Sequence, residues 1–290
     1  MISATMVKEL RNISGAGMMD AKRALVETDG DIEAAQDWLR TKGLLKAEKK
    51  SSRVAAEGLV GVCVEGSSGM IIEVNSETDF VATNEEFRSL VKLILSEGFQ
   101  CENIEQVLDK ELNNNTLRDV ITEKISTIGE NINPRRLSKL EGGNIYSYVH
   151  NSIENDLGKI GVLVSLEGVQ NEEIGKQIAM HIAAATPLAV SEDGVDSSLI
   201  NREKKIIKEQ LAEEGKSPEI ADKILAGKLK KFFEENTLLN QKFVMEPDLK
   251  VSEVLEKNQQ KIIDFRRFKV GEGIEKEATD FASEIKGIVS

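Results

Sequence analysis

The 290-residue sequence has only two histidines, two cysteines, four prolines, and nine Phe, two Tyr and one Trp. Two histidines leave few candidates for a zinc site or a histidine-based catalyst. The two cysteines, Cys63 and Cys101, are too few for a disulfide framework and lack metal-site spacing. With so few aromatic residues the cores must be aliphatic. Few prolines and 30% charged residues favour a helix-rich, ordered chain.

Long apolar runs are also absent. No run approaches the ~20 residues of a membrane span, and residues 1–12 lack the apolar core of a signal peptide. We therefore expect a cytoplasmic protein in a reducing compartment. The 38 Lys and Arg residues are outnumbered by 50 Asp and Glu residues, so the formal net charge is −12. Such a chain lacks the positive field that binds nucleic acid directly.

Two glycine-rich segments superficially resemble phosphate-binding loops. Residues 15–22 follow a predicted helix rather than a strand, and they lack the Gly-x4-Gly-Lys-Ser/Thr spacing. Residues 271–276 fail the same test. We therefore expect no nucleotide, cofactor or metal on this chain itself.

Residues 1–43 predict a head of three short helices, separated by Gly15–Gly17 and by Asp29-Gly30. Asp31 is expected to cap the third helix, and Gly43 to end it. The apolar positions with helical spacing are Ile2, Met6, Leu10 and Ile13, then Met18, Ala21 and Leu25, then Ile32, Ala35 and Leu39. So small a core is marginal alone, and such a head often presents a face to a partner.

Two features of the head leave alternatives open. Met18 and Met19 are adjacent and cannot both point inward, so either one is core and the other exposed, or they form an adaptable contact. Residues 40–53 contain six basic residues and one acidic residue. This composition favours a solvated spacer over a basic strip that faces an acidic partner.

A β-β-α pattern occurs twice, at about 58–95 and 143–186. The first copy has strands at 59–64 and 70–74, joined by a turn at 66–69. Thr83 and Glu86 have capping-box spacing before an amphipathic helix with Phe87, Leu90, Val91, Ile94 and Leu95 on one face. The second copy has strands at 145–149 and 160–166 and a helix with Ile174, Ile178, Ile182 and Ala185 on one face. We expect the two copies to pack as paired subdomains.

The remaining pattern is mainly helical. A helix with Leu117, Ile121, Ile125 and Ile128 on one face is expected to end at Gly129. Residues 197–235 predict two charged helices, which favours a protruding antiparallel hairpin over an ordinary packed pair. Residues 265–270 indicate a strand, and Ala278, Phe281, Ala282 and Ile285 a last helix. The fold class is α+β, divided into residues 1–54, 55–141, 142–270 with the hairpin, and a C-terminal module at 271–290.

The segment from Ser76 to Ala82 departs from the pattern, because Phe80 stands in a predicted loop. The residues alone favour a Phe80 that tucks under the loop as core over an exposed interface anchor. Glu77 and Asp79 also suggest metal binding or acid–base chemistry, but no third carboxylate, histidine or nucleophile accompanies them in sequence. His181 is expected to be a core histidine rather than a ligand.

Several blocks together resemble the bacterial elongation factor Ts family over essentially the whole chain. They are Gly15-Ala16-Gly17-Met18-Met19-Asp20-Ala21-Lys22, Glu73-Val74-Asn75-Ser76-Glu77-Thr78-Asp79-Phe80-Val81, Ile128-Gly129-Glu130-Asn131-Ile132, Ile178-Ala179-Met180-His181-Ile182 and Val270-Gly271-Glu272-Gly273. The resemblance implies a UBA-like head, a duplicated core and a guanine-nucleotide exchange factor for elongation factor Tu, a partner that itself carries GDP, GTP and Mg²⁺. It implies no enzyme and no cofactor.

The resemblance also implies site residues. Thr78, Asp79, Phe80 and Val81 would form a loop that enters beside the partner's Mg²⁺ site, with Phe80 as a wedge and Asp79 supporting the loop. The contact residues implied are Arg11, Met18, Met19 and Lys22 in the head and Ile128, Gly129, Glu130, Asn131 and His150 in the core. A homodimer or a 2:2 complex is compatible with the hairpin and the duplicated core, and neither feature requires one.

Two hypotheses from other classes compete with exchange. The first is an adaptor that docks some other protein through its head. The second is an enzyme that uses Glu77 and Asp79 as a carboxylate pair.

Overall fold

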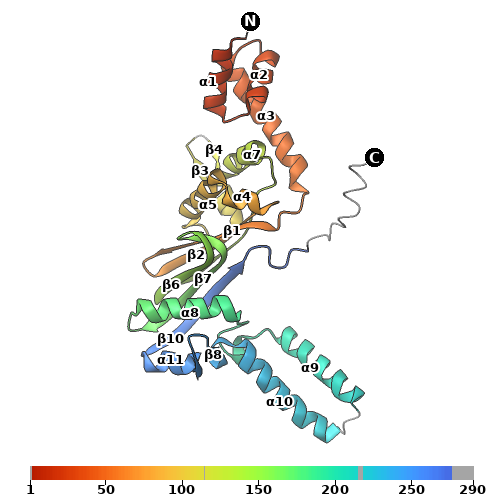
Figure 1. Cartoon of the computed structure of the whole chain (residues 1–290), viewed down its shortest axis with the longest axis vertical. Coiled ribbons are helices and arrows are strands. Elements are labelled where there is room, and N and C mark those ends of the chain that lie inside the picture. Colours follow the sequence, from red (N-terminus) through yellow and green to blue (C-terminus); the bar gives the residue numbers. More distant parts are fainter. Residues whose placement is uncertain (1, 114, 215–217, 276–290) are drawn as a thin grey trace. The chain divides into compact units, whose positions relative to one another are not determined.

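The computed structural model describes residues 2–113, 115–214 and 218–275. The chain forms two compact units and passes between them several times. Unit 1 contains the residues up to Val60, Ile72–Leu137 and the residues from Lys269, and unit 2 contains Gly61–Ile71 and Ser138–Phe268. Helices and antiparallel strand pairs occur together (Figure 1), which confirms the α+β class. Among the described residues, no helix combines the length and the apolar character needed to cross a membrane.

The head of unit 1 has the three predicted helices, α1 (Ala4–Ser14), α2 (Met18–Glu27) and α3 (Ile32–Ser51). Gly15 ends α1 at φ 66°, and Asp31 caps α3 by accepting a hydrogen bond from the Ala34 amide at 2.9 Å. The buried core consists of Val7, Leu10, Ala21, Ala24, Leu25 and Ala35. Ile13 and Met18 are not in it, because their side chains are 56% and 61% exposed.

The third helix does not end at Gly43 as predicted, because it continues through most of the segment 40–53 that was predicted to be a spacer. Helix α3 continues to Ser51, and Gly43 is buried within it against Ser126 of α7 (Leu117–Ile128). Gly43 is therefore an interior residue of the helix rather than a left-handed C′ residue, and it has room for a Cβ, which would lie 3.7 Å from Ser126. Four of the basic side chains have partners inside the chain: Arg40 with Asp119, Lys46 with Asp20, Lys50 with the Ile125 carbonyl, and Arg53 with Glu77.

Strands β1 (Glu57–Glu65) and β2 (Ser68–Ser76) form the predicted hairpin, with Gly66 at φ 60° in its turn. Strand β5 (Asn133–Glu141), which the pattern did not predict, lies beside β2. Helix α5 (Glu85–Gly98) buries the predicted apolar face. Its cap is Asn84, which accepts from the Glu86 amide at 2.7 Å, and not Thr83, which ends the short helix α4 (Asp79–Thr83). Smaller elements are α6 (Ile104–Leu108), β3 (Glu111–Leu112) and β4 (Asn115–Thr116).

Unit 2 contains the second β-β-α copy. Strands β6 (Asn144–Glu154) and β7 (Leu157–Gly168) pair antiparallel, with Tyr148 opposite Val162, and α8 (Glu172–Ala185) packs against both. Strand β10 (Gln260–Lys269) pairs with β7 and extends the predicted 265–270 strand. The core also takes side chains from β8 (Lys242–Phe243) and α11 (Val251–Lys257), and β9 (Glu246–Lys250) pairs with β8.

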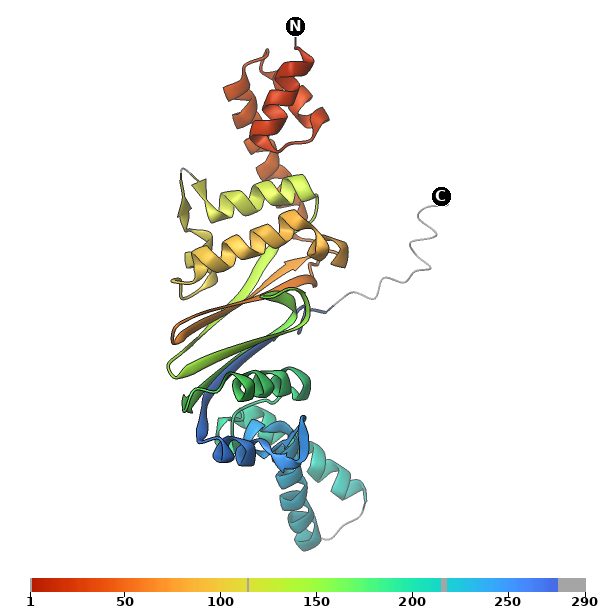
Figure 2. The ribbon, with the colours of Figure 1, turned by 60° about the vertical axis from the view of Figure 1, so that its left-hand side comes forward.

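Helices α9 (Ser197–Glu213) and α10 (Pro218–Asn236) form the predicted hairpin, which extends from the rest of unit 2 in Figures 1 and 2. Ile207 and Leu211 are buried, whereas Ile220 is 52% exposed. The last predicted helix, with Ala278 and Phe281, lies outside the described residues, as does most of the predicted module at 271–290. The four-part division of the chain stays a prediction.

Candidate functional site

Phe80 is the most exposed of the large apolar side chains that the structure describes, at 81%. It lies in α4, a five-residue helix that directly follows β2, and its neighbours Val81 and Ala82 are buried. Those two residues attach α4 to unit 1 and leave the ring of Phe80 in solvent. The interpretation of Phe80 as core is therefore wrong, and the exposed aromatic is confirmed.

Glu130 holds the segment that carries Phe80. Gly129 ends α7 with φ 92°, so the chain turns and Glu130 follows immediately. One carboxylate oxygen of Glu130 accepts a hydrogen bond from the Thr78 amide at 3.0 Å, and the other accepts one from the Thr78 hydroxyl at 2.6 Å. Hydrogen bonds to an ionised acceptor are about twice as strong as neutral ones. Thr78, the N-cap of α4, is thus fixed by one side chain.

Glu77 and Asn131 make a second connection beside the first. The Asn131 amide donates to Glu77 Oε1 at 2.6 Å, and the Asn131 side chain donates to the Arg53 carbonyl at 2.8 Å. Arg53 in turn lies 3.4 Å from Glu77 Oε2. These contacts join the residues just after α3 to the Phe80 segment. We call Glu77, Thr78, Glu130 and Asn131 the clamp.

Lys50 lies at the edge of the clamp. Its ammonium donates to the Ile125 carbonyl at 3.3 Å, near the C-terminal end of α7, where a cation is favoured. Burial, followed by the charge of Arg53, lowers the pKa of Lys50 below its ordinary value. Lys50 thus serves as a helix-end partner.

Asp79 does not support the loop in the way the resemblance implied. It is exposed in the first turn of α4, and no hydrogen bond or ion pair joins its carboxylate to any residue that the structure describes. The support comes from Thr78 instead. Asp79 therefore lies beside Phe80 as a charge available to a partner.

The head residues implied as contacts are all exposed. Met19 is 76% exposed and Met18 61%, so the interpretation that one of them is core is wrong. Arg11 and Lys22 are exposed as well. Arg11 and Met18 also border a groove of about 810 Å³ between the head and α7, whose far wall includes Asp119 and Glu123.

The other implied contacts differ in exposure. Gly129 is exposed and Ile128 half-buried, whereas Asn131 is buried, and its side chain, like that of Glu130, is used inside the chain. His150 lies in unit 2 on β6, exposed, with its Nδ1 3.1 Å from the Tyr148 hydroxyl.

His181 is a buried, fully hydrogen-bonded core residue, as expected. Its Nδ1 accepts from the Val244 amide at 3.2 Å, so Nε2 carries the proton and donates to Gln241 Oε1 at 2.9 Å. Burial lowers the pKa of His181, and the Gln241 bond opposes this. No cluster of three or more His, Cys, Asp or Glu side chains suited to a metal ion occurs in the described part of the chain.

Pattern reasoning missed the supports of the Phe80 segment. The Glu77–Asn131 and Thr78–Glu130 contacts span 54 and 52 residues, so no local spacing reveals them. The one local signal is the glycine at the end of α7, which places the next two residues outside the helix.

An exposed aromatic side chain on a clamped short helix, and exposed methionines on a small helical head, define a protein that acts by binding another macromolecule. The comparisons with known proteins make this specific. The family model described as "Elongation factor TS" matches residues 77–272. A protein named elongation factor Ts from Paracoccus denitrificans is 53% identical over 287 residues, covering 98% of this chain and 97% of its own length.

Those from Ruegeria sp. TM1040 and Cereibacter sphaeroides are each 51% identical, over 284 and 291 residues, with the same coverage of both chains. The chain belongs to the elongation factor Ts family.

Proposed function

We propose that this translation elongation factor is a guanine-nucleotide exchange factor for elongation factor Tu. It binds the GDP form of that partner and releases GDP so that GTP can bind. Family membership supports the partner and the reaction. The observation that supports the mechanism is that Phe80 is exposed while the clamp holds the segment that carries it.

In the proposed mechanism, the Thr78–Val81 segment enters beside the partner's Mg²⁺ site. Mg²⁺ supplies the main counter-charge to the nucleotide phosphates there, so disturbing its surroundings weakens their binding. Phe80 acts as a wedge, because a rigid apolar ring can displace partner side chains without losing much conformational entropy of its own. Asp79 presents a negative charge next to it.

The reaction follows from linkage. A factor that binds the nucleotide-free partner more tightly than the GDP-bound partner lowers GDP affinity by the same coupling free energy. The factor speeds both release and entry of nucleotide, and it makes or breaks no covalent bond. We accordingly propose that the chain is not an enzyme with its own catalytic residues, and that it acts in the cytoplasm, where translation takes place.

Two further surfaces complete the proposed contact. On the head, Met18, Met19, Arg11 and Lys22 would bind the partner's nucleotide domain. On the core, Ile128, Gly129 and His150 would make direct contact, whereas Glu130 and Asn131 would act mainly through the clamp, because their side chains already have partners. The proposal allows a homodimer of the chain or a 2:2 complex with its partner. The mass of the purified complex tests this.

The test is the release of labelled GDP from purified elongation factor Tu. The intact chain should accelerate release. Phe80→Ala should lower that acceleration about tenfold, equal to about 1.4 kcal/mol of transition-state free energy. Its free energy of unfolding should stay within about 0.5 kcal/mol, because an exposed ring contributes little to the core.

Val169→Ala is the matched control, since Val169 is an exposed apolar residue, at 61%, outside the proposed contacts. It should leave release unchanged. No acceleration by the intact chain would refute the proposed function. Capture of a different protein through the head would favour the adaptor instead.

A further inference from the structure

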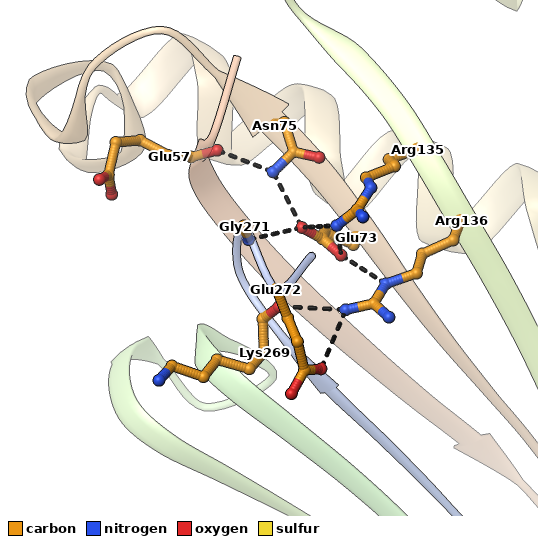
Figure 3. Close-up of polar contacts among 8 residues, drawn as sticks. All are labelled: Glu57, Glu73, Asn75, Arg135, Arg136, Lys269, Gly271 and Glu272. Atoms are coloured by element: carbon orange, nitrogen blue, oxygen red, sulfur yellow. Dashed lines mark hydrogen bonds and ion pairs between the residues drawn. The ribbon is translucent and has the colours of Figure 1, made fainter. Parts of the chain in front are cut away.

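A buried carboxylate lies on β2, the strand that leads to Phe80. Glu73 is fully buried, in a strand whose residues from Gly69 to Ser76 are all buried. A buried carboxylate is very unfavourable unless it is paired and hydrogen-bonded. Figure 3 shows that donors surround it. They are Arg136 Nε at 2.5 Å, the Gly271 amide at 2.7 Å, Asn75 Nδ2 at 2.9 Å and Arg135 Nη1 at 3.3 Å.

The cluster joins four stretches of unit 1. Asn75 also donates to the Glu57 carbonyl at 3.0 Å, at the start of β1. Arg136 Nη2 donates to the Lys269 carbonyl at 3.1 Å and lies 3.4 Å from Glu272 Oε2. Two arginines thus face two glutamates, so the named charges balance. Because Glu73 is excluded from water, salt screens these contacts less than surface pairs.

The approach of Gly271 requires a glycine. Its φ is 71°, and a Cβ there would lie 2.3 Å from the Ala56 carbonyl oxygen. The backbone at Gly271 therefore comes close enough to donate to Glu73 only without a side chain.

The same two stretches of chain that form the clamp also form this cluster. Glu73 and Asn75 precede Glu77 and Thr78 on one stretch, and Arg135 and Arg136 follow Glu130 and Asn131 on the other. Strands β2 and β5 are neighbours in the sheet. The Glu73–Arg136 contact thus links β2 to β5 close to the clamp, on the same two stretches of chain that bring Glu130 to Thr78. Helix α4 is too short to keep its own position.

We propose that Glu73, with Arg135 and Arg136, is a positioning site that links β2 to β5 and through the clamp aims Phe80 at the partner. Glu73 touches neither nucleotide nor partner in this scheme. The inference rests on the proposed exchange function and names residues outside the contact surfaces that it requires.

The experiment is GDP release from elongation factor Tu over a range of factor concentrations, with the full chain and Glu73→Gln. The variant keeps the shape of the side chain and removes its charge. We expect the release rate at saturating factor to fall about fivefold, with half-saturation changed less than about twofold. A merely structural role would reduce the folded fraction, which raises the apparent half-saturating concentration and leaves the saturating rate unchanged.

Three further variants sharpen the outcome. Arg136→Lys keeps the charge but cannot contact Glu73 and Lys269 together, and it decides the question if Glu73→Gln does not fold. Glu105→Gln, which removes an exposed carboxylate paired with Arg118 at 3.0 Å, should match wild type. In a Phe80→Ala background, Glu73→Gln should lower the saturating rate no further, since both act through one group.

Wild-type saturating rates in both Glu73→Gln and Arg136→Lys, or full additivity with Phe80→Ala, would overturn the positioning role while leaving the exchange function intact. A wild-type chain that fails to release GDP would instead refute the proposed function.

Discussion

The residues around Phe80 have two different roles: some hold the segment in place, and others remain exposed to solvent. Val81 and Ala82 supply burial, Thr78 supplies the hydrogen bonds, and Phe80 and Asp79 remain in solvent. From the sequence alone, the burial of Phe80 could be predicted only from the average behaviour of aromatic residues. That average favours a buried side chain. Its exposure depends on contacts with Glu130 and Asn131, more than fifty residues away in the chain, so local patterns could not reveal it.

Thr78→Val tests the clamp at one atom. The change keeps the volume of the side chain but removes the hydroxyl that donates to Glu130 at 2.6 Å. We expect the free energy of unfolding to fall by about 1–2 kcal/mol, because a hydrogen bond to a charged group is lost in a partly buried site. Urea denaturation measures this, and GDP release should slow as well.

Thr122→Val is the matched control for that variant. Its hydroxyl donates to the Arg118 carbonyl within an exposed turn of α7, so its loss should change stability by less than about 0.5 kcal/mol. Equal effects of the two variants would argue against a clamp at Thr78.

At the scale of elements, amphipathic helices were the most predictable parts. The apolar faces of α5, α7 and α8 are encoded by their own residues, at their own spacing. Strand β5 was missed because it is largely polar, and its two arginines pair with Glu73 on β2, which is far away in the sequence. The end of α3 was misplaced because glycine occurs both at helix ends and inside helices, and at Gly43 it lies inside one.

Gly43→Ala distinguishes those two uses of glycine by the sign of its effect. Within α3, the new Cβ would lie 3.7 Å from Ser126, an ordinary contact, and alanine favours the helix. We expect a gain of about 0.5–1 kcal/mol in thermal or urea unfolding. Gly227→Ala in α10, where nothing lies within 4 Å of the added carbon, should behave alike. A destabilised Gly43→Ala would indicate a left-handed helix end at that position.

At the scale of the whole molecule, the β-β-α repeat was visible in sequence, but the two units were not. Each unit is assembled from separated stretches, so its boundaries follow strand pairing rather than chain order. Composition and periodicity describe neighbours in sequence, and they contain no information on which distant stretches pair.

The stability of the molecule should depend on pH through His181. Its pKa is lowered in the folded state, so the unfolded chain binds more protons as the pH falls below the ordinary value of 6.5. The stability that this group contributes is therefore fully present above about pH 6.5 and declines below it, with a slope of at most about 1.4 kcal/mol per pH unit for one proton. Protonation would also place a hydrogen on Nδ1 of His181. Nδ1 could then no longer accept the hydrogen bond from the Val244 amide, and two donors would face each other.

Unfolding by urea between pH 5 and 8 measures this dependence. His181→Gln should be less stable at pH 8 and lose most of the slope between pH 5 and 6.5. His150→Gln, at an exposed position, should keep the wild-type slope. A wild-type slope in His181→Gln would show that other groups govern the acid limb.

The bond from Gly271 to Glu73 has a consequence for the order in which the protein is made. Ribosomes synthesise chains from the N-terminus, so β1, β2 and β5 emerge well before residues 269–272 exist. Until then the carboxylate of Glu73 lacks one of its donors and Arg136 lacks the Lys269 carbonyl. The last contacts within unit 1 can therefore form only after all of unit 2 has been translated. The head of unit 1 has been synthesised long before that.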